Sequence, residues 1–243
     1  MASRLVLGTC LLMLAVLGGC GGGHNSGTPV IPISNNVRMM QAADEWQYSV
    51  EGTATVASAT VPVTGTWQVT VSPETVDVQV VTPTTRKTVT CTVLIDGGDV
   101  HGTNYSFTVA NRLYVLQSPT GAVNVYGGRN GRDFTITEPD TGCYPFMASP
   151  MMIQTSWGGN VVQSNGFTFN VELVVVDEEV IEVPDGTFET FRATGNGIFG
   201  GHPAIMQVWY APQVGAPVQI RVICDDGSGN TLRLDLKLTS KTR

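Results

Sequence analysis

The sequence contains little charge and few aromatic residues for its length. Of its 243 residues, 14% are Asp, Glu, Lys or Arg and 7% are aromatic, whereas about 25% of the residues in an average soluble protein are charged. Acidic residues outnumber basic ones, which gives a formal net charge of −7, and the basic residues form no cluster. Such a chain repels phosphate backbones, so we expect no nucleic-acid partner.

Sequence motifs of catalysis and metal binding are missing as well. The chain has no Gly-x-Ser-x-Gly, no His-Glu-x-x-His, no phosphate-binding loop and no Cys-x-x-Cys. Such motifs place a nucleophile, a metal or a phosphate against the groups that act on it. We therefore predict a protein that is not an enzyme and that holds no cofactor and no metal.

The longest hydrophobic run lies near the N-terminus. A basic start, Met1–Arg4, precedes thirteen apolar residues, Leu5–Leu17, whereas a bilayer-spanning helix needs about 20. The run ends in Leu17-Gly18-Gly19-Cys20, which resembles the bacterial lipobox. That resemblance implies cleavage after Gly19 and a lipid on the Cys20 thiol. The alternative is an ordinary signal peptide in which Cys20 has no role.

Three parts of the chain follow from this interpretation. Residues 1–19 are the signal peptide, residues 20–36 are a Gly-rich flexible tether that carries the lipid, and residues 37–243 are a single β domain. Two or more acyl chains, such as palmitate, give stable membrane attachment. We expect an exported, membrane-anchored lipoprotein, in the outer membrane if the organism has one and otherwise on the outer face of the cytoplasmic membrane.

Alternation of apolar and polar residues dominates the rest of the chain. The clearest examples are Leu232, Leu234, Leu236 and Leu238 near the C-terminus, Val218, Ile220 and Val222, and Val76, Val78 and Val80. This period of two is typical of antiparallel strands that bury one face. About a dozen strands fit, with no room for crossover helices, so the fold class is all-β with a mostly antiparallel sheet.

Turn signals and one helical pattern complete this prediction. Expected turns lie at Asp96–Gly98, Ser118–Gly121, Gly127–Gly128, Pro184–Gly186 and Asp225–Asn230. Asn36 could cap a short N-terminal helix over Val37–Trp46. Three prolines and a Gly pair predict a long connection near residues 138–159, and Asp177-Glu178-Glu179 a solvated kink or bulge in a long strand.

Three motifs resemble a group of uncharacterised bacterial lipoproteins. They are Trp46-Gln47-Tyr48, the hairpin Val183–Phe191 (VPDGTFETF) and the strand and turn Trp209–Gly215 (WYAPQVG). The group is thought to share the curved half-barrel sheet of the lipoprotein carriers LolA and LolB. The resemblance therefore implies a curved sheet or half-barrel, LolA/LolB-like, and an envelope location. It implies no catalytic residue.

Methionine and aromatic side chains gather in the predicted long connection. Phe146, Met147, Met151, Met152 and Trp157 lie in a Pro-broken segment. Adaptable side chains of this kind could line a site for an apolar ligand or lipid on the concave face of the sheet. The commoner explanation is that they form a plug that fills that face.

The three cysteines after the tether give a weaker hypothesis. Cys91, Cys143 and Cys224 could form one disulfide in an oxidising compartment, in any of three pairings, or stay buried thiols.

Asp96, Asp99 and His101 could bind a metal or serve a hydrolase, but a polar hairpin loop is the commoner explanation. Asp226, Ser228 and Asn230 have the alternate spacing of a calcium loop, yet Lys237 stands where a Glu should be. We interpret that segment as a Gly-rich turn.

Two functions remain open besides the hydrolase. The predicted function is that of a non-catalytic lipoprotein that binds an apolar ligand or lipid on the concave face. The alternative is a structural or adaptor lipoprotein that binds other envelope proteins.

Overall fold

The computed structural model describes residues 35–84, 86–103, 105–136, 142–164, 168–199 and 202–242, and this part of the chain contains strands and turns but no helix. The strands are β1 (Glu45–Val56), β2 (Ala59–Val81), β3 (Arg86–Gly102), β4 (Tyr105–Gln117), β5 (Val123–Asn130), β6 (Arg132–Thr135), β7 (Tyr144–Met147), β8 (Ser156–Val162), β9 (Thr168–Val183), β10 (Gly186–Phe199), β11 (His202–Ala211), β12 (Ala216–Asp225) and β13 (Thr231–Thr242). The predicted all-β class is confirmed.

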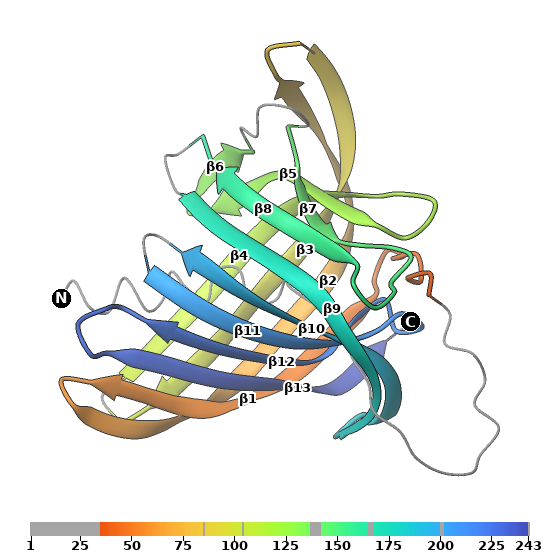
Figure 1. Ribbon diagram of the computed structural model, residues 1–243. Helices are drawn as coiled ribbons and strands as arrows, with labels where there is room; N and C mark the ends of the chain where they lie inside the picture. Colours follow the sequence, from red (N-terminus) through yellow and green to blue (C-terminus); the bar gives the residue numbers. More distant parts are fainter. Residues whose placement is uncertain are drawn as a thin grey trace, which may run out of the picture.

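All thirteen strands belong to one antiparallel sheet (Figure 1). Its order is β6-β5-β4-β3-β2-β1-β13-β12-β11-β10-β9-β8, and β7 pairs with β5. Two runs of neighbouring hairpins, β1 to β6 and β8 to β13, are thus joined side by side through the first and the last strand. Register along this joint runs from Glu45 opposite Thr242 to Thr55 opposite Thr231.

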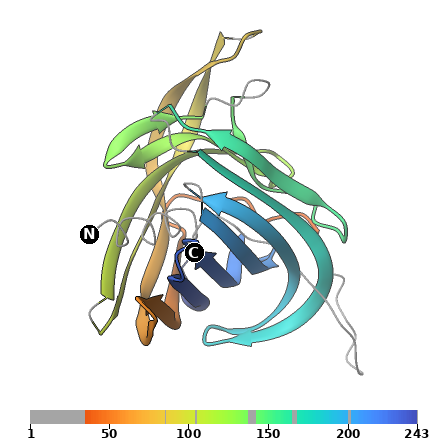
Figure 2. The same ribbon diagram turned by 60° about the vertical axis from the view of Figure 1, so that its left-hand side comes forward.

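The sheet curves strongly, so that its two edges approach each other (Figure 2). They meet at one isolated bridge between Ile136 and Gln163, beside which the Ser164 amide donates to the Thr135 carbonyl at 3.0 Å. Among the described residues, no continuous ladder closes the sheet at this point. The curved half-barrel that we expected is therefore confirmed.

The main core lies on the inner face of this curve. The four leucines of β13, Leu232 to Leu238, are at most 3% exposed and alternate with polar residues, as the period of two predicted. They belong to a cluster that draws buried side chains from both runs of hairpins. One hydrophobic core thus unites the domain.

A second, smaller cluster lies under the part of β2 and β3 that extends beyond β1. This part, residues 75–81 with 86–92, projects from the sheet in Figure 1 and is called the hairpin extension below. Its cluster contains Val78, Val80, Val89 and Cys91 from the extension, with Tyr126 of β5 and Cys143. The segment that leads into β7 therefore supports the extension from below.

Three local predictions were wrong. Residues 37–44 are irregular and Trp46 lies in β1, so no helix forms there. Asp96–Gly98 lies inside β3 and Gly127–Gly128 inside β5, so neither is a turn. In each Gly pair, one glycine leaves room for an aromatic ring from the neighbouring strand. At Gly98 a Cβ atom would be 2.5 Å from Cε3 of Trp67.

The other expected turns are present, at Ser118–Gly121, Pro184–Gly186 and Asp225–Asn230. The predicted long connection contains the four-residue strand β7 and the start of β8. Among the described residues, no helix is long and apolar enough to cross a membrane.

Candidate functional site

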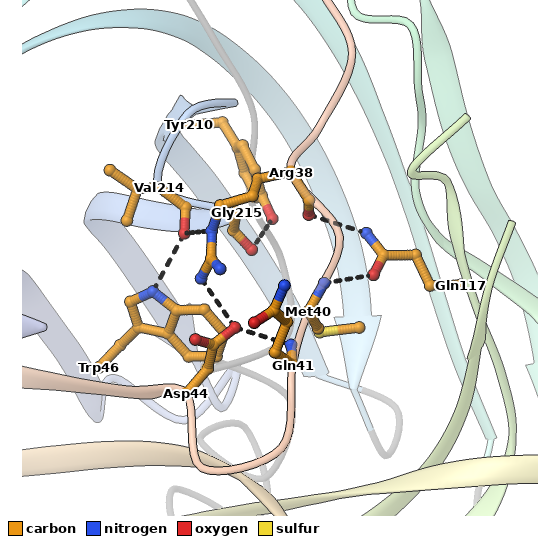
Figure 3. A network of polar contacts seen from close by, with 9 residues as sticks. All are labelled: Arg38, Met40, Gln41, Asp44, Trp46, Gln117, Tyr210, Val214 and Gly215. Carbon is orange, nitrogen blue, oxygen red and sulfur yellow. Dashed lines mark hydrogen bonds and ion pairs between the residues drawn. The ribbon is translucent and has the colours of Figure 1, made fainter. Parts of the chain in front are cut away.

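The three motifs that carry the family resemblance meet at one end of the sheet. Trp46 opens β1, the hairpin Val183–Phe191 joins β9 to β10, and Trp209–Gly215 forms the end of β11 with its turn into β12. The irregular segment 35–44, through which the chain enters the domain, lies beside Trp46 and the turn at Val214 and Gly215 (Figure 3). We call this region the entry site.

The turn between β11 and β12 is the centre of the entry site. The amides of Val214 and Gly215 donate to the carbonyl of Ala211 at 2.9 and 3.2 Å. Gly215 has a φ of +76°, a value that side-chain-bearing residues adopt at a cost. The tight turn leaves the Val214 carbonyl free to point at the entering segment.

Two side chains donate to that carbonyl. The indole Nε1 of Trp46 and Nε of Arg38 each lie 3.3 Å from the Val214 oxygen. The Arg38 amide also donates to the Pro212 carbonyl at 2.8 Å. One turn of the C-terminal run therefore fixes both the entering segment and the first strand.

The Arg38 guanidinium also neutralises a buried carboxylate. Its Nη2 lies 2.7 Å from Oδ2 of Asp44, and the Gln41 amide donates to the same oxygen at 2.8 Å. Asp44 is 1% exposed. A buried carboxylate without a charged partner destabilises the folded state. Arg38 therefore offsets the free-energy cost of burying Asp44.

Gln117, at the end of β4, holds the entering segment from the other run of hairpins. Its Oε1 accepts from the Met40 amide at 2.7 Å, and its Nε2 donates to the carbonyls of Arg38 and Gly121 at 3.1 and 3.0 Å. One amide side chain thereby satisfies three backbone groups, which fixes residues 38–40 between the two runs.

Two buried tyrosines complete the entry site. The hydroxyl of Tyr48 donates to the Pro217 carbonyl and that of Tyr210 to the Gly215 carbonyl, each at 2.9 Å. Burial raises the pKa of both hydroxyls well above the usual value. Both therefore stay neutral donors, and neither can act as a base.

A pocket of about 280 Å³ opens beside this network. Trp46 and Phe188 supply aromatic surface, and Lys241 lies with its Nζ 4.8 Å from the centre of the Phe188 ring. Lys241 also pairs with Asp185 of the β9–β10 turn. Since Arg38 and Lys241 both have a carboxylate partner, the pocket carries no uncompensated charge and no acid–base pair among its lining residues.

The structure separates the three residues of the hydrolase hypothesis. Asp96, Asp99 and His101 all lie in β3, where Asp96 points to the core and the other two lie on the exposed face. The polar hairpin loop that we expected there is wrong, because residues 86–102 form one strand. Among the described residues, no group of three potential ligands surrounds a metal position.

Asp96 nevertheless has an unusual environment. Nε1 of Trp67 donates to its Oδ1 at 2.6 Å and Nδ2 of Asn111 to its Oδ2 at 3.1 Å. Burial raises the pKa of Asp96 to about 7, although these two hydrogen bonds lower it. Alternation in the sequence did not reveal this residue, because a carboxylate on the inner face breaks the apolar pattern.

The five residues proposed for ligand binding divide into two groups. Phe146, Met147, Met151 and Trp157 are at most 8% exposed and belong to the main core cluster. Met152 is 52% exposed. The four buried side chains fill space between the strands, as expected of a plug, and ligand binding stays a proposal.

The three cysteines of the domain are buried thiols, and no disulfide joins them. Cys91 and Cys143 share the cluster under the hairpin extension, whereas Cys224 lies in the main core. Of the three pairings, the fold therefore favours Cys91 with Cys143. The lipidation residue Cys20 lies outside the described residues.

Two acidic segments have structural roles. In the turn before β13, Asp226 accepts hydrogen bonds from Ser228 and Asn230 side chains at 2.7 and 2.6 Å. These bonds lower the Asp226 pKa to about 2. In β9, Asp177 and Glu179 lie 3.0 and 3.7 Å from the Arg192 guanidinium.

Comparisons with known proteins add little. No family model and no curated protein matches the chain. A candidate exported protein with a YmcC-like fold from Bacteroides fragilis is 12% identical, with a TM-score of 0.36 over 86% of this chain and 99% of that one. A candidate lipoprotein from Parabacteroides distasonis is 10% identical, with a TM-score of 0.38 over 83% and 96%. At this level of likeness, neither protein indicates what this chain does, and the resemblance to LolA and LolB stays a prediction.

Proposed function

We propose that this chain is an exported, lipid-anchored lipoprotein of the cell envelope whose β domain is a non-catalytic adaptor for another envelope protein. The lipobox and the Gly-rich tether support the anchor. The outer face of the sheet supports the adaptor role, because it carries an apolar patch.

That patch crosses β10, β11 and β12. Ile198 and Ile205 are 50% and 54% exposed, and both lie on the same side of the β10–β11 pair. Ile223 of β12, which is half-buried, lies directly opposite Ile205. Adjoining exposed apolar side chains on a folded domain mark protein-binding surfaces more often than scattered ones do.

Photo-crosslinking in cells tests the adaptor role. A crosslinking amino acid at Ile205 is expected to give discrete higher-mass adducts with an envelope protein. The same probe at Glu51 of β1, outside the patch, serves as the control. Adducts that are equally abundant at both positions, or recovery of the monomer alone, would contradict the proposal.

The anchor is tested separately. The substitution Cys20→Ala should leave an intact domain that no longer fractionates with membranes. This variant should not incorporate labelled palmitate. If the unsubstituted protein is not labelled by palmitate either, the lipid anchor is wrong.

One observation favours a second candidate function, the binding of an apolar ligand on the inner face. The indole nitrogen of Trp157 is buried and has no hydrogen-bond partner within the part of the chain that the structure describes. A ligand with an acceptor atom would satisfy this donor. Because Met147, Met151 and Trp157 now fill that space, the ligand would have to displace the plug.

Native mass spectrometry of the protein extracted from membranes distinguishes the two functions. A co-purifying molecule that is lost from a Trp157→Phe variant but kept in Trp209→Phe would support the ligand. Spectra that contain only the anchored chain leave the adaptor role as the better account.

A further inference from the structure

The turn between β7 and β8 holds two apolar side chains in water. Met152 and Ile153 are 52% and 49% exposed. The Thr155 amide donates to the Met152 carbonyl at 2.9 Å, and the Met152 amide donates to Oγ1 of Thr155 at 3.2 Å. The Gln154 amide is bound to the Val175 carbonyl at 2.8 Å.

This turn is fixed at some cost. Gln154 has a φ of +74°, a region that non-glycine residues rarely adopt. Met151, just before the turn, is fully buried. The fold therefore holds Met152 and Ile153 in one defined place. It does so although exposing two apolar side chains to water is unfavourable.

The same turn adjoins the point where the chain enters the domain. The Met151 amide donates to the Asn35 carbonyl at 2.7 Å, and the Val37 amide donates to Oγ of Ser149 at 3.1 Å. Met39, further along the entering segment, is 43% exposed. Three exposed apolar side chains thus lie on the two segments that are bonded to each other at the domain's entrance.

Charge is distributed to suit an anionic lipid surface at this end. The chain has 20 acidic residues, yet residues 113–128 and 142–164 contain no charged residue, and residues 35–43 contain only Arg38. The turn Ser118–Gly121 belongs to the first of these segments and touches Ser149 through Thr120. Negative lipid headgroups would repel carboxylates within a Debye length, and these segments themselves present none. Of the acidic residues that follow Val175 in β9, Asp177 and Glu179 are paired with Arg192, which leaves Glu178 and Glu182.

Building on the lipid anchor of the proposed function, we propose that Met152, Ile153 and Met39 dip into the surface of the membrane that holds the Cys20 lipid. Fourteen residues separate Cys20 from Asn35, which limits the distance between them to about 50 Å. The anchor therefore keeps this end of the domain near the bilayer at a high local concentration. Weak interfacial contacts are then enough to orient the domain.

A labelled cysteine reports this contact in the full lipidated protein. Met152→Cys creates an accessible thiol, because Cys91, Cys143 and Cys224 are buried and Cys20 carries the lipid. The protein, labelled with an environment-sensitive fluorophore, is reconstituted into phosphatidylethanolamine–phosphatidylglycerol (3:1) vesicles that contain brominated acyl chains. Ile205→Cys is the matched control, since Ile205 is 54% exposed and lies six residues, about 20 Å along β11, from the entry site.

The label at position 152 is expected to be quenched at least threefold more strongly than the label at position 205. In a second variant the label is placed at Met39→Cys. Its quenching should fall about threefold when Met152→Ser and Ile153→Ser are added. Neither change touches the core, so circular dichroism should be unaltered.

The outcomes separate this inference from the anchor itself. The mass of the N-terminal peptide is measured in the same sample. A missing lipid overturns the anchor and this inference with it. A lipidated protein whose labels at 152 and 205 are quenched equally overturns the membrane contact alone, as does crosslinking at position 152 in cells to a discrete protein.

Discussion

Two buried carboxylates, at different places in the molecule, are accommodated in opposite ways. Asp44, at the entry site, and Asp96, in the middle of β3, are each 1% exposed. Asp44 has the Arg38 guanidinium at 2.7 Å. Within the described part of the chain, the partners of Asp96 are the neutral donors of Trp67 and Asn111. The entry site therefore contains a compensated charge, whereas the centre of the sheet contains a carboxyl group that the fold prefers to keep protonated.

The difference indicates what each position contributes. The ion pair of Arg38 and Asp44 fixes the irregular segment 35–44 between the two runs of strands. The charge of Asp44 therefore helps to set the conformation of that segment. Asp96 ties only its own strand to β2 and β4, and it does so at a free-energy cost that grows as the carboxyl group ionises.

The largest effect that we expect is the pH dependence of stability due to Asp96. Its pKa of about 7 in the folded protein exceeds the unfolded value of about 4, so folding takes up a proton between these values. The contribution of Asp96 to the free energy of unfolding should therefore be greatest below pH 4 and should fall by about 4 kcal/mol as the pH rises to 7.

Denaturant titrations of the unsubstituted protein and of Asp96→Asn, from pH 4 to pH 8, check this prediction. The amide cannot ionise, and Asn111 can turn its own amide to face it. The difference between the two profiles should change by the stated amount over this range. A constant difference would show that Asp96 is ionised throughout.

Removing the charge partner of Asp44 should have the next largest effect. Arg38→Met leaves a buried carboxylate without compensation and removes one donor from the Val214 carbonyl. We expect a loss of about 3 kcal/mol in the free energy of unfolding. Arg221→Met is the control, since Arg221 pairs with Asp235 on the surface and should cost about 1 kcal/mol or less. Equal losses in urea titrations would remove the contrast between the two carboxylates.

The smallest effect should come from Trp46→Phe at the entry site. This change removes the indole donor but leaves the Val214 carbonyl its bond from Arg38, so we expect a loss of about 1 kcal/mol. In Arg38→Met the same change should cost more, because the carbonyl then has no donor from either side chain. A double-mutant cycle measures this coupling, and strict additivity would mean that the two bonds do not act together.

The strands could be predicted where one face is uniformly apolar. Leu232 to Leu238 and Val218 to Val222 alternate without interruption, and both segments are strands as expected. Glycines misled the prediction at Gly98, because it lies opposite Trp67 and leaves room for the indole. A sequence shows the glycine but not the ring that crosses it from another strand.

The entry site could be predicted only in part. The three motifs of the resemblance identified its segments, but not that Val214 would accept from both Arg38 and Trp46. The helical pattern over residues 37–46 failed because Trp46 is buried in the core as part of β1, and segment 35–44 is fixed by Gln117 and Pro212 across long distances in sequence. Local periodicity carries no information about such partners.

The pairing of β1 with β13 has a consequence for how this domain matures. Some 190 residues separate partners such as Tyr48 and Leu238, so closing this ladder carries a large entropic penalty and comes late. Until β13 pairs with β1, the main ladder between the two runs of hairpins is missing, and the runs are linked through the segment around β7 and the bridge between Ile136 and Gln163. The incompletely folded chain thus exposes an open sheet edge on each half, and any delay in the pairing of β13 prolongs the period in which neighbouring chains can pair with these edges.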